Sequence, residues 1–380
     1  MLNNETKQLF TVVISQGQSR SPEKRELEKG IAEAAATISG ARVLKVPHLY
    51  DLPKDSETYK TLRSLEGDLV VLSWLFDRAT HWTLDRHGIR GQIGEVLLKQ
   101  QFDEEEEESE APEPESVERV TDSQPRDDRY IFCIDFRASS QPAEYADEFR
   151  RILSARQESW IQDSKSHSHS PAGLSADFNE VGLNLGAASL ARFNSPTNDT
   201  YVGSNAKIDS PLSVLFGTSS VATIDEQPGR RWYPVIDFSR CTNCMECIDF
   251  CLFGVYGVDS IETIVVEQPD NCRKGCPACS RVCPQNAIIF PQHKTPAIAG
   301  APVDTGGMKI DLSKLFGAPE EGEDAAAVAA RERDEQLLLA GRQAVGLSTG
   351  ISERLAKQSD ASKKHDELDD LIDQLDSLDL

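Results

Sequence analysis

The sequence has no run of about 18 apolar residues, which is roughly the length that a membrane-spanning helix needs. We therefore expect no membrane span. The first ten residues, MLNNETKQLF, lack the basic start and apolar core of a secretory signal peptide, which favours a cytoplasmic protein with reduced thiols. Aromatic residues make up 7% of the chain and hydrophobic residues 39%, so we expect a sizeable share of the 380 residues to be loop or disordered.

Basic residues are also few, with 40 Lys and Arg against 63 Asp and Glu and a net charge of −23. Much of the acidic excess lies in two segments. Residues 103–128 hold 13 acidic and 2 basic side chains, and residues 360–380 hold 8 acidic and 2 basic. Because binding to nucleic acid needs a basic patch that displaces counterions from phosphates, we expect no such binding. The segment 103–128 is also rich in Pro, and its composition predicts a disordered insertion.

Strand-like and helix-like segments alternate over residues 1–155. The apolar run Phe10–Ser15 is followed by a helix over residues 22–38, with Ser21 as its N-cap and Pro22 at its first position. Further strands are predicted at Arg42–Val46, Asp68–Leu75 and Tyr130–Phe136, and further helices near residues 55–65, 80–86, 92–101 and 143–153. Strands separated by helices of this length indicate βαβ units, so the expected fold of this domain is α/β with a parallel sheet.

The remaining non-cysteine segments are less regular. Residues 156–228 are rich in Ser, Asn, Asp, Gly and Pro and are predicted to form an irregular connector, in which His167 and His169 are expected to be disordered and not to bind metal. Residues 297–380 are predicted to be a linker and a helical, acidic and partly disordered tail, with a helix near 325–339. The last 16 residues predict an amphipathic helix that docks on this chain or on a partner, with an apolar stripe of Leu368, Leu371, Ile372, Leu375 and Leu378.

Eight of the nine cysteines lie in two runs. The first run reads Cys241-Thr-Asn-Cys244-Met-Glu-Cys247-Ile-Asp-Phe-Cys251, and the second reads Cys272-Arg-Lys-Gly-Cys276-Pro-Ala-Cys279-Ser-Arg-Val-Cys283-Pro. The first run has the C-x₂-C-x₂-C-x₃-C spacing of iron–sulfur ligands, and the second has one extra residue in its first gap. Structural zinc uses two cysteine pairs per ion, and disulfide frameworks suit short secreted domains, so both fit this pattern less well.

The spacing also predicts which cysteines act together. Three closely spaced cysteines wrap a loop around three iron corners, while the fourth is expected at the start of a short helix, pointing toward the neighbouring cluster. We therefore expect two [4Fe–4S] clusters with crossed ligands. One would be held by Cys241, Cys244, Cys247 and Cys283, and the other by Cys272, Cys276, Cys279 and Cys251. Cys133 lies alone in an apolar strand and is expected to be a buried small hydrophobe.

On these motifs, residues 229–296 resemble the bacterial-type ferredoxins with two four-iron clusters. The resemblance implies a small α+β ferredoxin-like domain, one-electron transfer and redox protein partners. Short strands are expected at Val235–Phe238 and Ala287–Phe290, with a hairpin of Tyr256–Val258 and Thr263–Glu267 between them. The chain departs from the family where Leu252 follows Cys251 in place of proline, and Gly275 is expected to allow the longer second loop to bend.

Two sets of residues in the α/β domain are candidates for a further site. The loop Gln16–Arg20 could hold an anion at a helix N-terminus or be an ordinary polar turn, because it lacks a full phosphate-loop motif. It resembles the first loop of the tetrapyrrole chelatases, but Gln16 stands where that family has its metal-handling histidine, which argues against chelation. The second set follows the third strand and would either form a site or serve packing and solvation. Its members are Trp74, Asp77, Arg78, His81, Trp82, Asp85, Arg86, His87 and Arg90.

Three functions are consistent with these features. The first is an electron-transfer protein in which a ferredoxin module is fused to an α/β domain that docks a partner. The second is a redox enzyme, or an enzyme subunit, whose α/β domain binds a cofactor or substrate and receives electrons from the clusters. The third is a protein whose clusters stabilise the fold or sense oxidants.

Overall fold

The protein is described by a computed structural model. The structure describes residues 10–100, 118–124, 127–166, 220–302, 325–347 and 349–350. Within residues 127–166, side chains are described up to residue 158. Residues 1–150 and 219–380 form one compact unit, and residues 151–218 form a second. In the part of the chain that the structure describes, no helix is long and apolar enough to cross a membrane.

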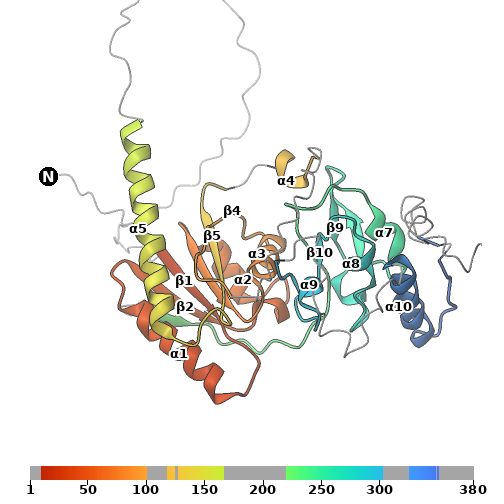
Figure 1. The fold of residues 1–380 in the computed structure, drawn as a ribbon, viewed down its shortest axis with the longest axis horizontal. Coiled ribbons are helices and arrows are strands. Elements are labelled where there is room, and N and C mark those ends of the chain that lie inside the picture. Colours follow the sequence, from red (N-terminus) through yellow and green to blue (C-terminus); the bar gives the residue numbers. More distant parts are fainter. Residues whose placement is uncertain are drawn as a thin grey trace, which may run out of the picture. The chain divides into compact units, whose positions relative to one another are not determined.

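The first unit is built around a six-stranded parallel sheet, which confirms the predicted α/β class (Figure 1). The strand order is β4-β5-β3-β1-β2-β6. The strands are β1 (Phe10–Ser15), β2 (Ala41–Val46), β3 (Leu69–Ser73), β4 (Gln92–Ile93), β5 (Tyr130–Asp135) and β6 (Val221–Thr223). All residues of β1 and β3 are buried, because helices cover both faces of the sheet.

Helices connect the strands as the alternating pattern predicts. They are α1 (Pro22–Ala36), η1 (Leu49–Asp51), α2 (Glu57–Ser64), α3 (Asp77–Arg86) and α5 (Pro142–Ser166). Ser21 is the N-cap residue of α1 and Pro22 is at its start, as expected, although the Ser21 side chain makes no capping hydrogen bond. Figure 1 shows α1 on one face of the sheet and α2 and α3 on the other. The chain order therefore reverses between the neighbouring strands β1 and β3, which is where α/β sheets most often bind ligands.

The predicted helix over residues 92–101 is wrong. Gln92 and Ile93 instead form β4, which pairs with β5, and no helix is assigned from there to residue 100. Two glycines explain the difference, because each lies too close to β5 to carry a side chain. A Cβ atom at Gly91 would lie 2.8 Å from the carbonyl oxygen of Arg129, and one at Gly94 would lie 2.2 Å from Cδ1 of Phe132.

Two segments predicted to be irregular contain regular structure. Within the acidic insertion, α4 (Val120–Ser123) is a short helix in which Val120 is buried. Its backbone N–H donates to the carbonyl oxygen of Cys241 at 2.9 Å, which ties this part of the insertion to the first cysteine run. Within the predicted connector, α5 continues to Ser166, and β6 adds to the edge of the sheet beside β2. His167 and His169 lie outside the described residues, as does the apolar stripe of the C-terminal tail.

The cysteine-rich part is an α+β arrangement of short elements. The strands β7 (Val235–Ile236) and β10 (Ile288–Ile289) pair antiparallel, and β8 (Tyr256–Val258) and β9 (Ile264–Val266) form the expected hairpin. The helices are α7 (Glu246–Phe250), η2 (Pro269–Asn271), α8 (Ala278–Val282), α9 (Pro296–Ala299) and α10 (Ala325–Leu339). The domain boundaries near residues 155 and 229 stay predictions.

The sheet and the cysteine-rich part share a hydrophobic core. Residues of η1, of α3 and of the segment between β3 and α3 pack in one cluster with residues of the segments around β7 and β10. At its centre the rings of Tyr50 and Tyr233 stack with centroids 4.3 Å apart. The Tyr50 hydroxyl makes two hydrogen bonds to the backbone of Tyr233: it donates to the carbonyl oxygen at 2.5 Å and accepts from the N–H at 2.7 Å. In return, the Tyr233 hydroxyl donates to the carbonyl oxygen of Tyr50 at 2.8 Å. These contacts join parts of the chain that are 183 residues apart.

Candidate metal centre

Four cysteines surround a hollow that we call hollow 1. Cys241, Cys244 and Cys247 from the first run line it together with Cys283 from the end of the second. Its empty volume is about 380 Å³, part of which is open to solvent, and its other lining groups are mainly apolar. These are the four cysteines that the spacing predicted would share one cluster.

The other four cysteines surround a second hollow, hollow 2, of similar size. Cys272, Cys276 and Cys279 from the second run line it together with Cys251 from the end of the first. Its empty volume is about 320 Å³, again including open space, and Arg273 and Arg333 also line it. The fold therefore brings the eight cysteines together in the two crossed sets that the sequence suggested.

Left-handed backbone conformations allow the first run to wrap around hollow 1. Asn243 and Met245 have φ values of 58° and 63°, on either side of Cys244. In the longer second run, Gly275 has a φ of 86°, so this glycine provides the extra bend.

The predicted position of the fourth cysteine in each run was wrong in one detail. Cys251 and Cys283 follow the short helices α7 and α8 and do not begin them. One helical turn separates the third cysteine from the fourth, and this turn carries the fourth toward the other hollow.

The electrostatic interactions among the thiols follow the same two sets. Burial raises the pKa of Cys247, and charge repulsion from the other three cysteines of hollow 1 raises it further. Burial likewise raises the pKa of Cys279, with added repulsion from the other three cysteines of hollow 2. Four thiolates in such a hollow are therefore stable only with a compensating positive charge, which bound iron would supply.

Several donors already point at the sulfur atoms. The backbone N–H of Asn243 donates to Sγ of Cys241 at 3.4 Å, and that of Ala287 donates to Sγ of Cys283 at 3.3 Å. At hollow 2, the buried hydroxyl of Tyr256 donates to Sγ of Cys279 at 3.1 Å. Such bonds stabilise thiolate in place of thiol.

The donors around each hollow can be compared with what a metal ion or a cluster needs. In the described ranges, no three His, Cys, Asp or Glu side chains lie close enough together to hold one metal ion. The four sulfurs instead surround a hollow, and a cubane is a cage whose four corners each need one thiolate. Each hollow has four cysteines, one for each corner of such a cage, so the donor set fits a [4Fe–4S] cluster.

Comparison with known proteins gives one relevant match. No protein-family model matches the chain, and no solved structure matches it. A curated protein of Methanocaldococcus jannaschii, described as an uncharacterized ferredoxin, is 50% identical to the chain over 66 residues. This match covers 17% of the chain and 44% of the relative, so the chain spans less than half of that protein. The chain contains a ferredoxin-like segment. We use that name below for residues 229–296, which have about the length of the match and carry the motifs.

The first candidate site in the sheet is filled by the protein itself. Beyond the ends of β1 and β3, the buried carboxylate of Glu28 accepts hydrogen bonds from the Gly17 N–H and from the indole Nε1 of Trp74, both at 2.8 Å. The ring also lies against the glycine, since a Cβ atom at Gly17 would be 2.7 Å from Cδ1 of Trp74. The loop Gln16–Arg20 thus directs an N–H donor toward an internal carboxylate, which supports the polar-turn interpretation over the anion site.

The second candidate set contacts the ferredoxin-like segment. Arg78 forms an ion pair with Asp237 at 2.5 Å and also donates to the carbonyl oxygen of Asn286. Arg86 donates to the carbonyl oxygen of Val266 at 3.1 Å. Trp82 packs in one hydrophobic cluster with residues of that segment, while His81 and Asp85 on α3 and His87 at its end are buried. Arg78, Arg86 and Trp82 therefore attach the α/β part to the ferredoxin-like segment.

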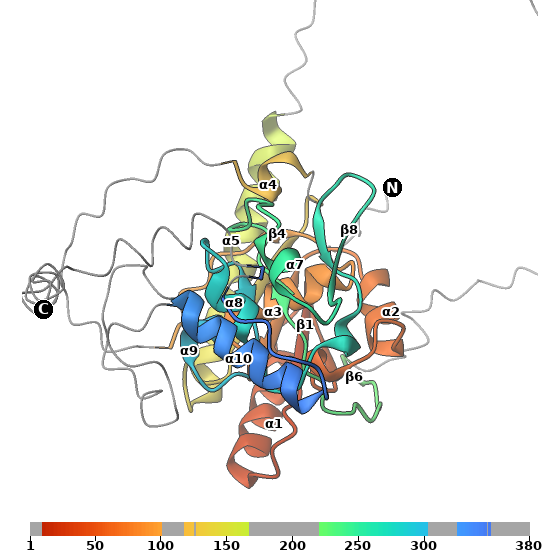
Figure 2. The same ribbon diagram turned by 90° about the vertical axis from the view of Figure 1, so that its right-hand side faces the viewer.

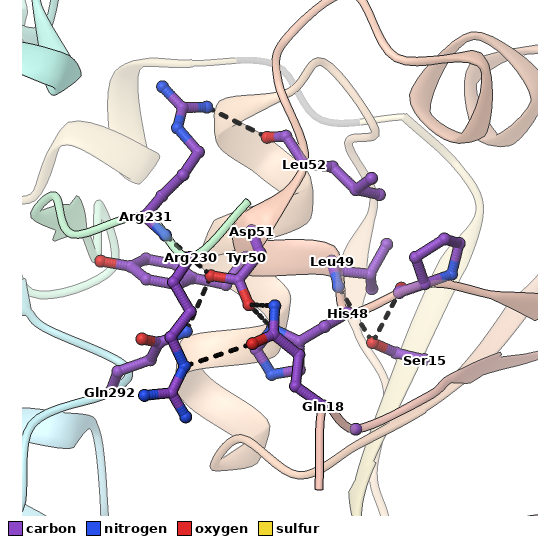
Figure 3. A network of polar contacts seen from close by, with 12 residues as sticks. Ser15, Gln18, His48, Leu49, Tyr50, Asp51, Leu52, Arg230, Arg231 and Gln292 are labelled. Carbon is purple, nitrogen blue, oxygen red and sulfur yellow. Dashed lines mark hydrogen bonds and ion pairs between the residues drawn. The ribbon is translucent and has the colours of Figure 1, made fainter. Parts of the chain in front are cut away.

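A further polar cluster was missed by the sequence analysis. At its centre is Asp51, which is 1% exposed (Figure 3). Its carboxylate accepts hydrogen bonds from the Gln18 amide, the Arg231 backbone N–H and the Gln292 amide. It also pairs with His48 at 3.0 Å. The donors come from the end of β1, the end of β2 and two segments of the ferredoxin-like part. An acidic residue between Tyr50 and Leu52 in an otherwise apolar stretch was the signal available in the sequence.

The ninth cysteine stands apart from both hollows. Cys133 lies in β5 and is 7% exposed, in agreement with its prediction as a buried small hydrophobe. Burial raises the pKa of its thiol well above the usual value, so it stays protonated at neutral pH.

Proposed function

We propose that this protein transfers electrons through two [4Fe–4S] clusters, one in each hollow. Cys241, Cys244, Cys247 and Cys283 would hold the cluster in hollow 1, and Cys272, Cys276, Cys279 and Cys251 the cluster in hollow 2. When bound, each cluster accepts and releases one electron. The observation that carries the proposal is the division of eight cysteines into two sets of four, each combining three from one run with one from the other.

The route by which electrons enter and leave is suggested by the exposure of the ligands. Cys244 is exposed at hollow 1, whereas Cys276 and Cys279 at hollow 2 are buried. Because the rate of electron transfer falls with distance, we propose that redox protein partners in the cytoplasm dock at the Cys244 side. The similarity to a protein described as a ferredoxin supports such a role, because ferredoxins are electron carriers.

The α/β part is proposed to position the ferredoxin-like segment rather than to bind a substrate. Arg78, Arg86 and Trp82, which were candidates for an active site, lie in its contact with that segment. At the strand reversal, the Trp74 indole donates to the Glu28 carboxylate. The alternative of a redox enzyme would need a binding site elsewhere on the sheet.

Anaerobic purification of the full chain tests the proposal. We expect about eight iron and eight sulfide per chain, and after reduction an EPR spectrum with spin coupling between two cubanes. The variant Cys133→Ser is the matched control, since Cys133 lies outside both hollows, and it should retain the same iron content. About four iron per chain, or zinc without iron, would overturn the proposal.

A further inference from the structure

A helix from outside the ferredoxin-like segment packs against hollow 2. Figure 2 shows α10 lying beside α8, the helix that follows Cys276 and contains Cys279. The guanidinium of Arg281 on α8 makes two hydrogen bonds of 2.9 Å to the carboxylate of Glu332 on α10. The cysteine motifs give no indication of this contact.

The contact brings a buried cation to the hollow. Arg333, the next residue on α10, lines hollow 2 and is 1% exposed. Its guanidinium lies 4.5 Å from the ring centroid of Phe250, the residue before Cys251. Two of its N–H groups donate to the carbonyl oxygens of Thr349 and Gly346, each at 2.6 Å. These bonds fix the position of the charge.

Among the described residues, one carboxylate pairs with this arginine. Asp334 contacts it at 3.3 Å and is 15% exposed, while the two carbonyl groups are neutral. A buried guanidinium is costly unless it is well paired. A cubane with four thiolates carries net negative charge and would add a second, buried counter-charge.

A second donor acts on the same site from another direction. Tyr256, on β8, is 6% exposed, and its hydroxyl donates to Sγ of Cys279 at 3.1 Å. Hydrogen bonds to sulfur and nearby positive charge both favour the reduced cluster, which has one more negative charge than the oxidised one. Arg333 and Tyr256 should therefore shift the potential of one cluster in the same direction.

We propose that Arg333 is a positioning residue of the electron-transfer site and that it selectively raises the reduction potential of the cluster in hollow 2. The helix α10, which carries Arg333, is then a functional part of that site. The inference rests on the proposed function. In the reaction concerned, the oxidised cluster gains one electron from a low-potential one-electron donor, and no bond forms or breaks. Near Cys283 of hollow 1, Arg78 and Arg240 both pair with Asp237, and neither ion pair involves a residue of α10.

The test is an anaerobic redox titration of the full chain, followed by EPR, with dithionite as the reductant. In Arg333→Gln, one of the two reduction steps should become at least tenfold less favourable, which is about 59 mV for one electron, and the other should move far less. Tyr256→Phe should shift the same step downward, and Arg333→Lys should restore most of the loss. The control Arg331→Gln makes the same chemical change at an exposed position of α10 and should leave both steps in place.

Asp334→Asn tests the same idea without altering the arginine. It removes the carboxylate that pairs with Arg333, so the sensitive step should shift upward. This variant decides the matter if Arg333→Gln loses its clusters. The inference would be overturned if Arg333→Gln left both reduction steps unchanged or shifted both equally. It would also be overturned if Arg333→Gln and Tyr256→Phe shifted different steps, or if Asp334→Asn gave no upward shift. An iron count far below eight in the unmodified protein would instead refute the proposed function.

Discussion

Removing the hydroxyl of Tyr50 should loosen the contact between the sheet and the ferredoxin-like segment. Tyr50 is fully buried and Tyr233 is 1% exposed. In Tyr50→Phe the stacked ring remains, but the backbone N–H and the carbonyl oxygen of Tyr233 both lose their partner. A buried polar group without a partner costs about 1–3 kcal/mol, so the expected loss for two such groups is about 2–6 kcal/mol. Tyr233→Phe leaves one carbonyl oxygen unpaired, that of Tyr50, and should cost about 1–3 kcal/mol.

Hydrogen exchange measured by mass spectrometry on the anaerobic full chain can test this order. Because 1.4 kcal/mol is a factor of about ten in an opening equilibrium, peptides containing residue 233 should exchange at least tenfold faster in Tyr50→Phe than in the unmodified protein. Tyr233→Phe should give a smaller increase. Equal protection in Tyr50→Phe and the unmodified protein, or a larger effect of Tyr233→Phe, would refute the reasoning.

Three further predictions address other parts of the chain. Cys247→Ser and Cys283→Ser, although in different runs, should disturb the same EPR signal of the reduced protein, while Cys279→Ser should disturb the other. Gly94→Ala should destabilise the fold by about 1–3 kcal/mol in thermal unfolding, because its Cβ atom would overlap the aromatic ring of β5 that faces it. Burial lowers the pKa of His87 to about 3 in the folded protein. As pH falls below 6.5, His87 therefore takes up a proton in the unfolded chain but not in the folded one, which favours unfolding. Stability should then be about 2 kcal/mol lower at pH 5 than at pH 8, and His87→Phe should reduce that difference.

Each of these has a control or a contrary outcome. If the cysteines act within their own runs, Cys279→Ser and Cys283→Ser will affect one and the same signal. Gly229→Ala is the control for the glycine variant, because no atom lies within 4 Å of the added Cβ position. For the pH prediction, an equally steep loss of stability between pH 8 and pH 5 in His87→Phe would contradict the assignment to this histidine.

Local patterns predicted the regular parts of the fold well. The apolar run Phe10–Ser15 became β1 with the same bounds, since a continuous apolar strand is typical of a sheet covered on both faces. The crossed lining of the two hollows agrees with the grouping expected from the spacing, because each run carries its fourth cysteine away from its first three. Cluster binding by these cysteines stays a prediction. The helix expected near residues 92–101 failed, since close packing of Gly91 and Gly94 against β5 outweighed the local helix-forming residues.

Contacts between distant parts of the chain were not predictable in the same way. Nothing near Arg78 in the sequence indicates that its partner is Asp237, 159 residues later. The same holds for Arg333, which reaches hollow 2 from a helix that follows the cysteine runs by about 40 residues. A dense set of aromatic and charged residues has the same composition in an active site and in an internal contact. Tertiary structure is needed to distinguish them.

The central claim is that each hollow holds one cubane with crossed ligands. Diffraction from anaerobically grown crystals, with data collected at the iron absorption edge, measures this directly. The account predicts two groups of four iron peaks, one bounded by Cys241, Cys244, Cys247 and Cys283 and the other by Cys272, Cys276, Cys279 and Cys251. Iron in one hollow alone, a single-ion peak in either, or a group of peaks bounded by the four cysteines of one run would contradict it.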